Sequence, residues 1–175
     1  CAYMLRPLIA ELRAQGLLFH NQYRQARHDW NPLGPATKEQ MLAYLKPYGL
    51  VGLVPAEWMA DPMLAWNGAE LKLCMAVLQA RGVLQHGVKA HLDELIGDVQ
   101  TVEMSDIYHL FEMATIPDML AIRPSWLPEH AERQKTRALG YAEAIVEKQG
   151  FRALEQAPQI TVGTIHSVKG GEASR

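Results

Sequence analysis

A dense group of hydrogen-bonding side chains lies near the carboxyl end of this 175-residue chain. A β-branched run at 160–164 leads directly into a turn that gathers hydrogen-bonding side chains: Thr164, His166, Ser167, Lys169 and Glu172. Hydroxyl, imidazole and ammonium groups donate hydrogen bonds to phosphate oxygens, and a carboxylate accepts them from sugar hydroxyls. Gly170 and Gly171 permit positive φ and close backbone approach. The pattern predicts a phosphate-contacting or nucleotide-contacting loop, with a turn capped by its own side chains as the alternative.

This turn is not a complete catalytic centre. A P-loop requires Gly-x-x-x-x-Gly-Lys-Ser/Thr, whereas here Lys169 precedes Gly170, and no P-loop occurs elsewhere in the chain. No nucleophile or carboxylate stands at a spacing that pairs with His166, so general-base catalysis by this histidine is not expected. The segment therefore suits binding better than bond chemistry.

The stretch from Thr164 to Glu172 resembles motif V of the superfamily 1 helicases of the UvrD/Rep type. The usual form of that motif is Thr-hydrophobic-His-Ser-x-Lys-Gly-x-Glu, and every polar position is present here. The resemblance implies that Thr164, His166, Ser167 and Lys169 bind single-stranded DNA. It also implies that Glu172, beside Gly171, contacts the ribose of ATP.

The amino-terminal segment resembles motif IV of the same family. A helix is predicted before Gly16, which ends it, with Leu5, Leu8, Ile9 and Leu12 as its apolar positions. A short strand is predicted at 17–20. In the family an arginine near the start of such a helix reaches the γ-phosphate of ATP, and the aligned residue is Arg6. The strands at 17–20 and 160–164 are then expected to lie side by side and parallel in one sheet.

The segment after the first strand interleaves basic and aromatic residues. Arg24 and Arg27 stand close to Tyr23, His28 and Trp30. Cations that meet phosphates and rings that stack on bases suit a nucleic-acid strand. The alternative is a solvated loop with Trp30 in a core. The family resemblance places this segment near the DNA path, so both arginines are candidate DNA-binding residues.

The middle of the chain is predicted to be almost wholly helical. Expected helices lie at 37–46, 68–80, 88–96, 105–114 and 125–148, with a single turn at 55–59. Thr37, Ser105, and Ser125 or Pro128 are their expected starts, while Pro47 and Gly150 are expected stops. Leu92, Leu95 and Ile96 form the apolar side of 88–96. Inward positions of the last helix are Leu139, Ala142, Ile145 and Val146.

This organisation predicts a mostly α chain with a small α/β part. The resemblance implies a partial RecA-like (P-loop NTPase helicase) lobe of the 2A type at 1–31 and 159–175. Its parallel sheet is interrupted by a helical insertion of the 2B type at 32–158.

Composition is that of an ordinary globular protein. Hydrophobic residues make up 49% and charged residues 21% of the chain, and no apolar run is long enough to span a bilayer. Two cysteines give no disulfide framework, so a cytoplasmic location without membrane contact is expected. A net charge of −2 argues against tight DNA binding by this chain alone.

Other residue types are interpreted as structural. The seven histidines do not form a metal site, because His86 and His91 do not share a helical face and His109 with Glu112 supplies only two ligands. Four tryptophans are expected to anchor helical cores: Trp30, Trp58, Trp66 and Trp126. Seven methionines are expected to fill cores: Met41, Met59, Met63, Met75, Met104, Met113 and Met119.

The resemblance implies a fragment of an ATP-dependent DNA helicase that lacks the phosphate-binding lobe. ATP and Mg²⁺ would serve the full-length protein, with neither bound by this chain alone. Expected partners are single-stranded or forked DNA, the N-terminal RecA-like lobe of the same protein, and proteins that dock on the helical insertion. The alternative is a non-catalytic helical interaction module with helicase-like remnants.

Overall fold

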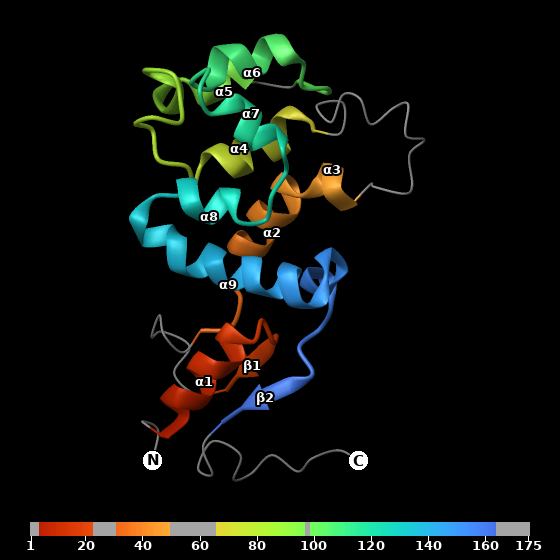
Figure 1. Ribbon diagram of the computed structural model, residues 1–175. Helices are drawn as coiled ribbons and strands as arrows, with labels where there is room; N and C mark the ends of the chain where they lie inside the picture. Colours follow the sequence, from red (N-terminus) through yellow and green to blue (C-terminus); the bar gives the residue numbers. More distant parts are fainter. Residues whose placement is uncertain (1–3, 23–30, 50–65, 97–98, 164–175) are drawn as a thin grey trace.

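The computed structural model describes residues 4–22, 31–49, 66–96 and 99–163 (Figure 1). The described chain is mostly helical, with one small sheet. Its α-helices are α1 (Leu5–Ala14), α2 (Pro35–Tyr44), α3 (Lys46–Gly49), α4 (Gly68–Met75), α5 (Leu92–Ile96), α6 (Met104–Leu110), α7 (Ile116–Leu120), α8 (Trp126–His130) and α9 (Arg133–Gln149). Two 3₁₀ turns, η5 (Val88–Ala90) and η6 (Phe151–Glu155), and two strands, β1 (Phe19–Asn21) and β2 (Ile160–Val162), complete the described elements. Figure 1 shows α1, β1 and β2 at one end, α9 across the middle, and α4 to α7 at the other end.

The two strands pair as the sequence predicts. β1 and β2 are parallel neighbours, with Phe19 opposite Ile160 and Asn21 opposite Val162. In β1, Phe19 and Asn21 are buried and His20 is exposed, which is the alternation of a strand with one covered face. The strand bounds differ from the predicted 17–20 and 160–164: β1 starts at Phe19, and β2 ends at Val162. Thr164 lies outside the described residues.

Gly16 ends α1 in the manner that the sequence indicates. Its φ is +60°, and the Gly16 and Leu17 amides donate to the carbonyls of Arg13 and Leu12 at 3.0 and 2.8 Å. These are the two hydrogen bonds of a Schellman motif, which satisfies carbonyls at a helix end. Ile9 and Leu12 are buried as predicted.

Helix α9 packs tightly on this turn. A Cβ atom on Gly16 would lie 2.3 Å from the Ala144 carbonyl oxygen, so only glycine permits the observed approach. Three α9 side chains donate hydrogen bonds to backbone carbonyls of the turn: Tyr141 to Leu17, Lys148 to Ala14 and Gln149 to Gly16. On its other faces α9 contacts α2 and α8. It therefore joins the α1/β1/β2 end of the molecule to the helical region.

Aromatic side chains form the centre of the helical core. Tyr44 stacks between Trp66 and Trp126, at ring-centroid distances of 6.3 and 5.3 Å. The indole of Trp66 donates to the Ala43 carbonyl at 3.0 Å, and the Tyr44 hydroxyl donates to Met119. The core role predicted for Trp66 and Trp126 is confirmed, while Trp30 and Trp58 lie outside the described residues.

The methionines follow the prediction less closely. Met41, Met75 and Met119 are buried, and Met104 packs partly against the core. Met113 is 63% exposed, so the prediction for it was wrong. Met59 and Met63 lie outside the described residues.

Two helix starts differ from the prediction. Helix α2 begins at Pro35 with Gly34 as its N-cap, rather than at Thr37, because a proline at the first helical position has its φ already set. Helix α6 begins at Met104, not after Ser105, because Glu103 and Asp106 form a reciprocal capping box. Pro47 does not end the helix before it. The break falls at Leu45, and Pro47 occupies the first turn of α3.

Two tertiary pairings shorten the predicted helices. Isolated antiparallel bridges join Leu78 to Ala131 and Leu84 to Phe111. The first stops 68–80 at Met75 and breaks 125–148 into α8 and α9; the second ends 105–114 at Leu110. Backbone groups used in these bridges are withdrawn from helical hydrogen bonding.

Two further expectations were wrong. The segment 88–96 divides into η5 and α5, with His91 between them. Leu8 and Leu95 were expected on apolar faces, yet they are 49% and 48% exposed. The inward side of α9 is confirmed, since the predicted positions are buried: Leu139, Ala142, Ile145 and Val146.

Candidate functional site

The carboxyl ends of β1 and β2 define the candidate site. Because the strands are parallel, both end at the same edge, where the Gln22 amide donates to the Val162 carbonyl at 3.1 Å. In open α/β sheets, ligands bind beyond the carboxyl ends of the strands. The Thr164–Glu172 motif begins two residues after Val162, and the Arg24/Arg27 segment begins shortly after Gln22. The sheet thus brings together the starting points of both candidate segments.

Most of the candidate side chains lie outside the described residues. This applies to the DNA-binding candidates and to the two ATP-binding candidates of the motif: Arg24, Arg27, Thr164, His166, Ser167, Lys169, Gly171 and Glu172. Their roles stay predictions from the sequence.

Arg6 is the candidate whose position is described. It is the second residue of α1 and is exposed to solvent. Figure 1 shows the start of α1 and the carboxyl end of β2 at the same end of the molecule. Nearby on the chain, Met4 and Leu8 are also exposed, at 66% and 49%. An exposed guanidinium at this end is accessible to an anionic group, since arginine presents five donors in a planar fork.

Asn21 is a residue of this edge that the sequence reasoning missed. It is the last residue of β1, it is 0% exposed, and it lies opposite Val162. Buried amide side chains are hydrogen-bonded in native proteins. The signal was its spacing: Asn21 is two residues after Phe19, and alternate residues of a strand share one face.

A second missed group lies between α1 and α9. The Arg13 guanidinium stands over the Tyr141 ring, 4.6 Å from its centroid. It donates to the backbone carbonyls of Asn31 at 2.9 Å and Arg137 at 3.4 Å. Burial raises the pKa of Tyr141 to about 12, and the nearby Arg13 charge opposes part of that rise. Arg13 thereby links α1, the connection into α2, and α9.

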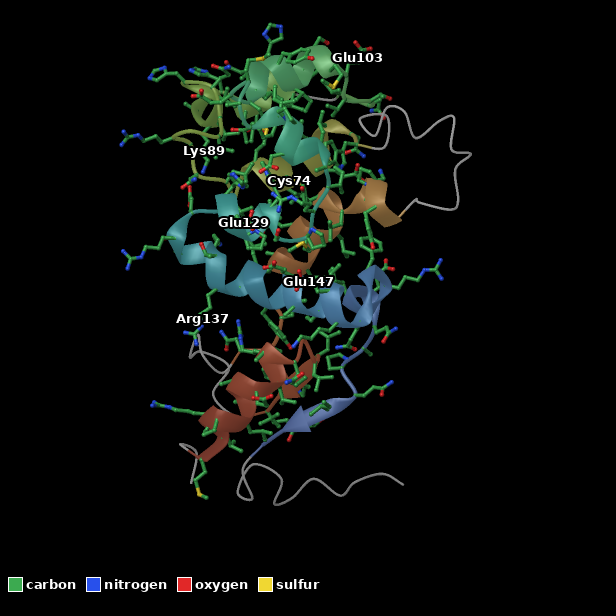
Figure 2. The ribbon with its side chains drawn as sticks, in the orientation of Figure 1. Cys74, Lys89, Glu103, Glu129, Arg137 and Glu147 are labelled. Atoms are coloured by element: carbon green, nitrogen blue, oxygen red, sulfur yellow. The ribbon has the colours of Figure 1, made fainter. Side chains whose placement is uncertain are left out.

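Several lysines of the helical region are held by carboxylates. Lys46 lies 2.6 Å from Glu70, and Lys72 lies 2.9 Å from Asp93. Lys89, labelled in Figure 2, pairs with Glu132, and its hydrogen bond and charge lower the pKa of that carboxyl. These pairs locally neutralise charge that would otherwise attract nucleic-acid phosphates.

Two further carboxylates, Glu129 of α8 and Glu147 of α9, act electrostatically on Glu143. Glu143 lies on α9 and is only partly exposed. Its pKa is raised, first by burial and then by the charges of Glu147 and Glu129. Glu129 and Glu147 are labelled in Figure 2.

Replacing Glu143 with glutamine should stabilise the protein at neutral pH. Folding raises the pKa of the Glu143 carboxyl, so the folded state holds its proton to a higher pH than the unfolded state does. The folded protein therefore loses stability as the pH rises through the folded-state pKa. The E143Q variant should therefore melt about 1–2 °C higher at neutral pH, and the difference should vanish at about pH 4. Thermal unfolding at both pH values tests this. E155Q, which alters an exposed carboxylate on η6, should show no such pH-dependent gain; an equal gain would contradict the assignment to Glu143.

The described histidines and Cys74 are not arranged for metal binding or thiol chemistry. Within residues 4–22, 31–49, 66–96 and 99–163, no three histidine, cysteine or carboxylate side chains are placed to hold a metal ion. His91 instead lies 3.0 Å from Glu94. Cys74 lies on the buried side of α4, and burial raises the pKa of its thiol. A buried neutral thiol is a poor nucleophile.

Comparisons with known proteins add no family assignment. No protein-family model, no curated protein and no solved structure matches this chain. In the described part of the chain, no helix has both the length and the apolar character required to cross a membrane.

Proposed function

We propose that this chain is part of the motor of an ATP-dependent DNA helicase or translocase of the UvrD/Rep type. One observation supports this most: β1 and β2 are parallel neighbours although the helical region separates them in sequence. Strands that follow the motif IV-like helix and precede the motif V-like turn meet at one sheet edge. In this proposal, the two short segments with helicase-like residues belong to one lobe.

In this proposal the sheet belongs to a partial RecA-like lobe at 1–31 and 159–175, and 32–158 is its insertion. ATP would bind as its Mg²⁺ complex between this lobe and an N-terminal lobe that carries the phosphate cradle. Arg6 would reach the γ-phosphate, while Glu172 and Gly171 would lie at the ribose. A cation near the transferred phosphoryl group stabilises charge that develops in the transition state.

The DNA strand would cross the same sheet edge. Thr164, His166, Ser167 and Lys169 would donate to its phosphates, with Arg24 and Arg27 as further cations. Residues that contact ATP and DNA would then share one short turn after β2. Closure of the two lobes on ATP would move that turn and change its hold on the strand.

Binding of single-stranded DNA tests the motif V assignment. This chain should bind an oligothymidylate weakly at low salt, and K169A should lower the affinity about 5–10-fold because one phosphate contact is lost. Fluorescence anisotropy at two salt concentrations would measure the affinity and a reduced salt slope. K135A, which removes an exposed lysine from α9, is the matched control and should bind like the parent chain. Equal affinity of K169A and K135A would refute the assignment.

The chain alone should not turn over ATP, because it has no P-loop. Sustained ATP hydrolysis by the purified chain would contradict the proposal, after a control with the heat-unfolded protein excludes a contaminant.

A second candidate function is that of a non-catalytic interaction module. Exposed apolar side chains on and after the distal helices favour it: Leu95, Tyr108 and Met113 are 48%, 47% and 63% exposed. Single exposed apolar residues are common, so this is the weaker candidate. The two functions differ in one experiment. Addition of the N-terminal lobe should produce DNA-stimulated ATP hydrolysis if the chain belongs to a motor, and none if it is a module.

A further inference from the structure

We draw no further inference here: the strongest candidate, the cavity that residues between Ala80 and Ala90 form with Glu112, carries nothing, because the exposed Arg81 and Glu112 that line it are opposite in charge, Lys89 is held by Glu132, and nothing in the structure shows what covers it.

Discussion

Replacing Gly16 with alanine should cause the largest loss of stability of any single-methyl change in the described chain. The new Cβ would lie 2.3 Å from the Ala144 carbonyl oxygen and 2.9 Å from the Ile145 amide nitrogen, and both atoms are backbone of α9. Backbone cannot rotate away as a side chain can, so α9 must shift from the end of α1. The φ of +60° adds strain for any residue with a Cβ. A loss of about 3–5 kcal/mol is expected, measured as the urea midpoint of unfolding.

Two other glycines separate the causes of this loss. Gly82 has a φ of +76° and no atom within 4 Å of the position that a Cβ would take, so G82A should cost only the backbone strain of about 1–2 kcal/mol. Gly140 lies inside α9 with open space and no positive φ, so G140A should stabilise the helix by about 0.5–1 kcal/mol. A G16A protein as stable as G82A would show that the contact between α1 and α9 contributes little.

Substitution of Arg6 should have the largest effect on activity. In a protein that contains both lobes, R6A should lower the rate of ATP hydrolysis about 10³-fold, because it removes a cation from the γ-phosphate. R6K should recover little of the rate, since lysine lacks the planar fork of donors. The affinity for single-stranded DNA should change by less than about two-fold, because the proposed DNA contacts lie in other segments. Steady-state kinetics with saturating DNA would measure the effect as a fall in kcat.

Arg152 provides the control for Arg6. It is an exposed arginine on η6 in the helical region, so R152A should leave ATP hydrolysis unchanged. If R6A hydrolysed ATP at a rate within a few-fold of that of the parent protein, Arg6 would not have the γ-phosphate contact that the resemblance to motif IV implies. If R6A reduced DNA binding as strongly as hydrolysis, Arg6 would belong to the DNA contact instead.

Local sequence signals predicted the parts of the fold that depend on neighbouring residues. Gly16 ends α1 as expected, and the period of apolar residues identified the buried side of α9. The pairing of β1 with β2 was predicted only through the resemblance to motifs IV and V. Neither strand has a feature that specifies a partner so far away in the sequence.

The candidate site divides in the same way. The residue types of the segment Thr164–Glu172 predicted phosphate contact without any structure, because such donors are informative by themselves. The burial of Asn21 was indicated only by its spacing from Phe19, and the Arg13–Tyr141 contact gave no signal. Each of them depends on which segments meet, and a single arginine or asparagine in a sequence has many ordinary explanations.

The sequence by itself determined the helical character, the place of the two strands, and the side-chain chemistry available in the segment that follows β2. These features follow from local propensity and from side-chain type. Tertiary structure decided where the helices break and what α9 contacts. The bridges of Leu78 with Ala131 and Leu84 with Phe111 interrupt segments whose local pattern favours longer helices. The close contact of Ala144 with Gly16 forms only when α9 packs on the end of α1, and these two segments are far apart in the sequence. Tertiary contacts can override helix propensity because propensity differences amount to only about 1 kcal/mol per residue, whereas buried packing and backbone pairing contribute more.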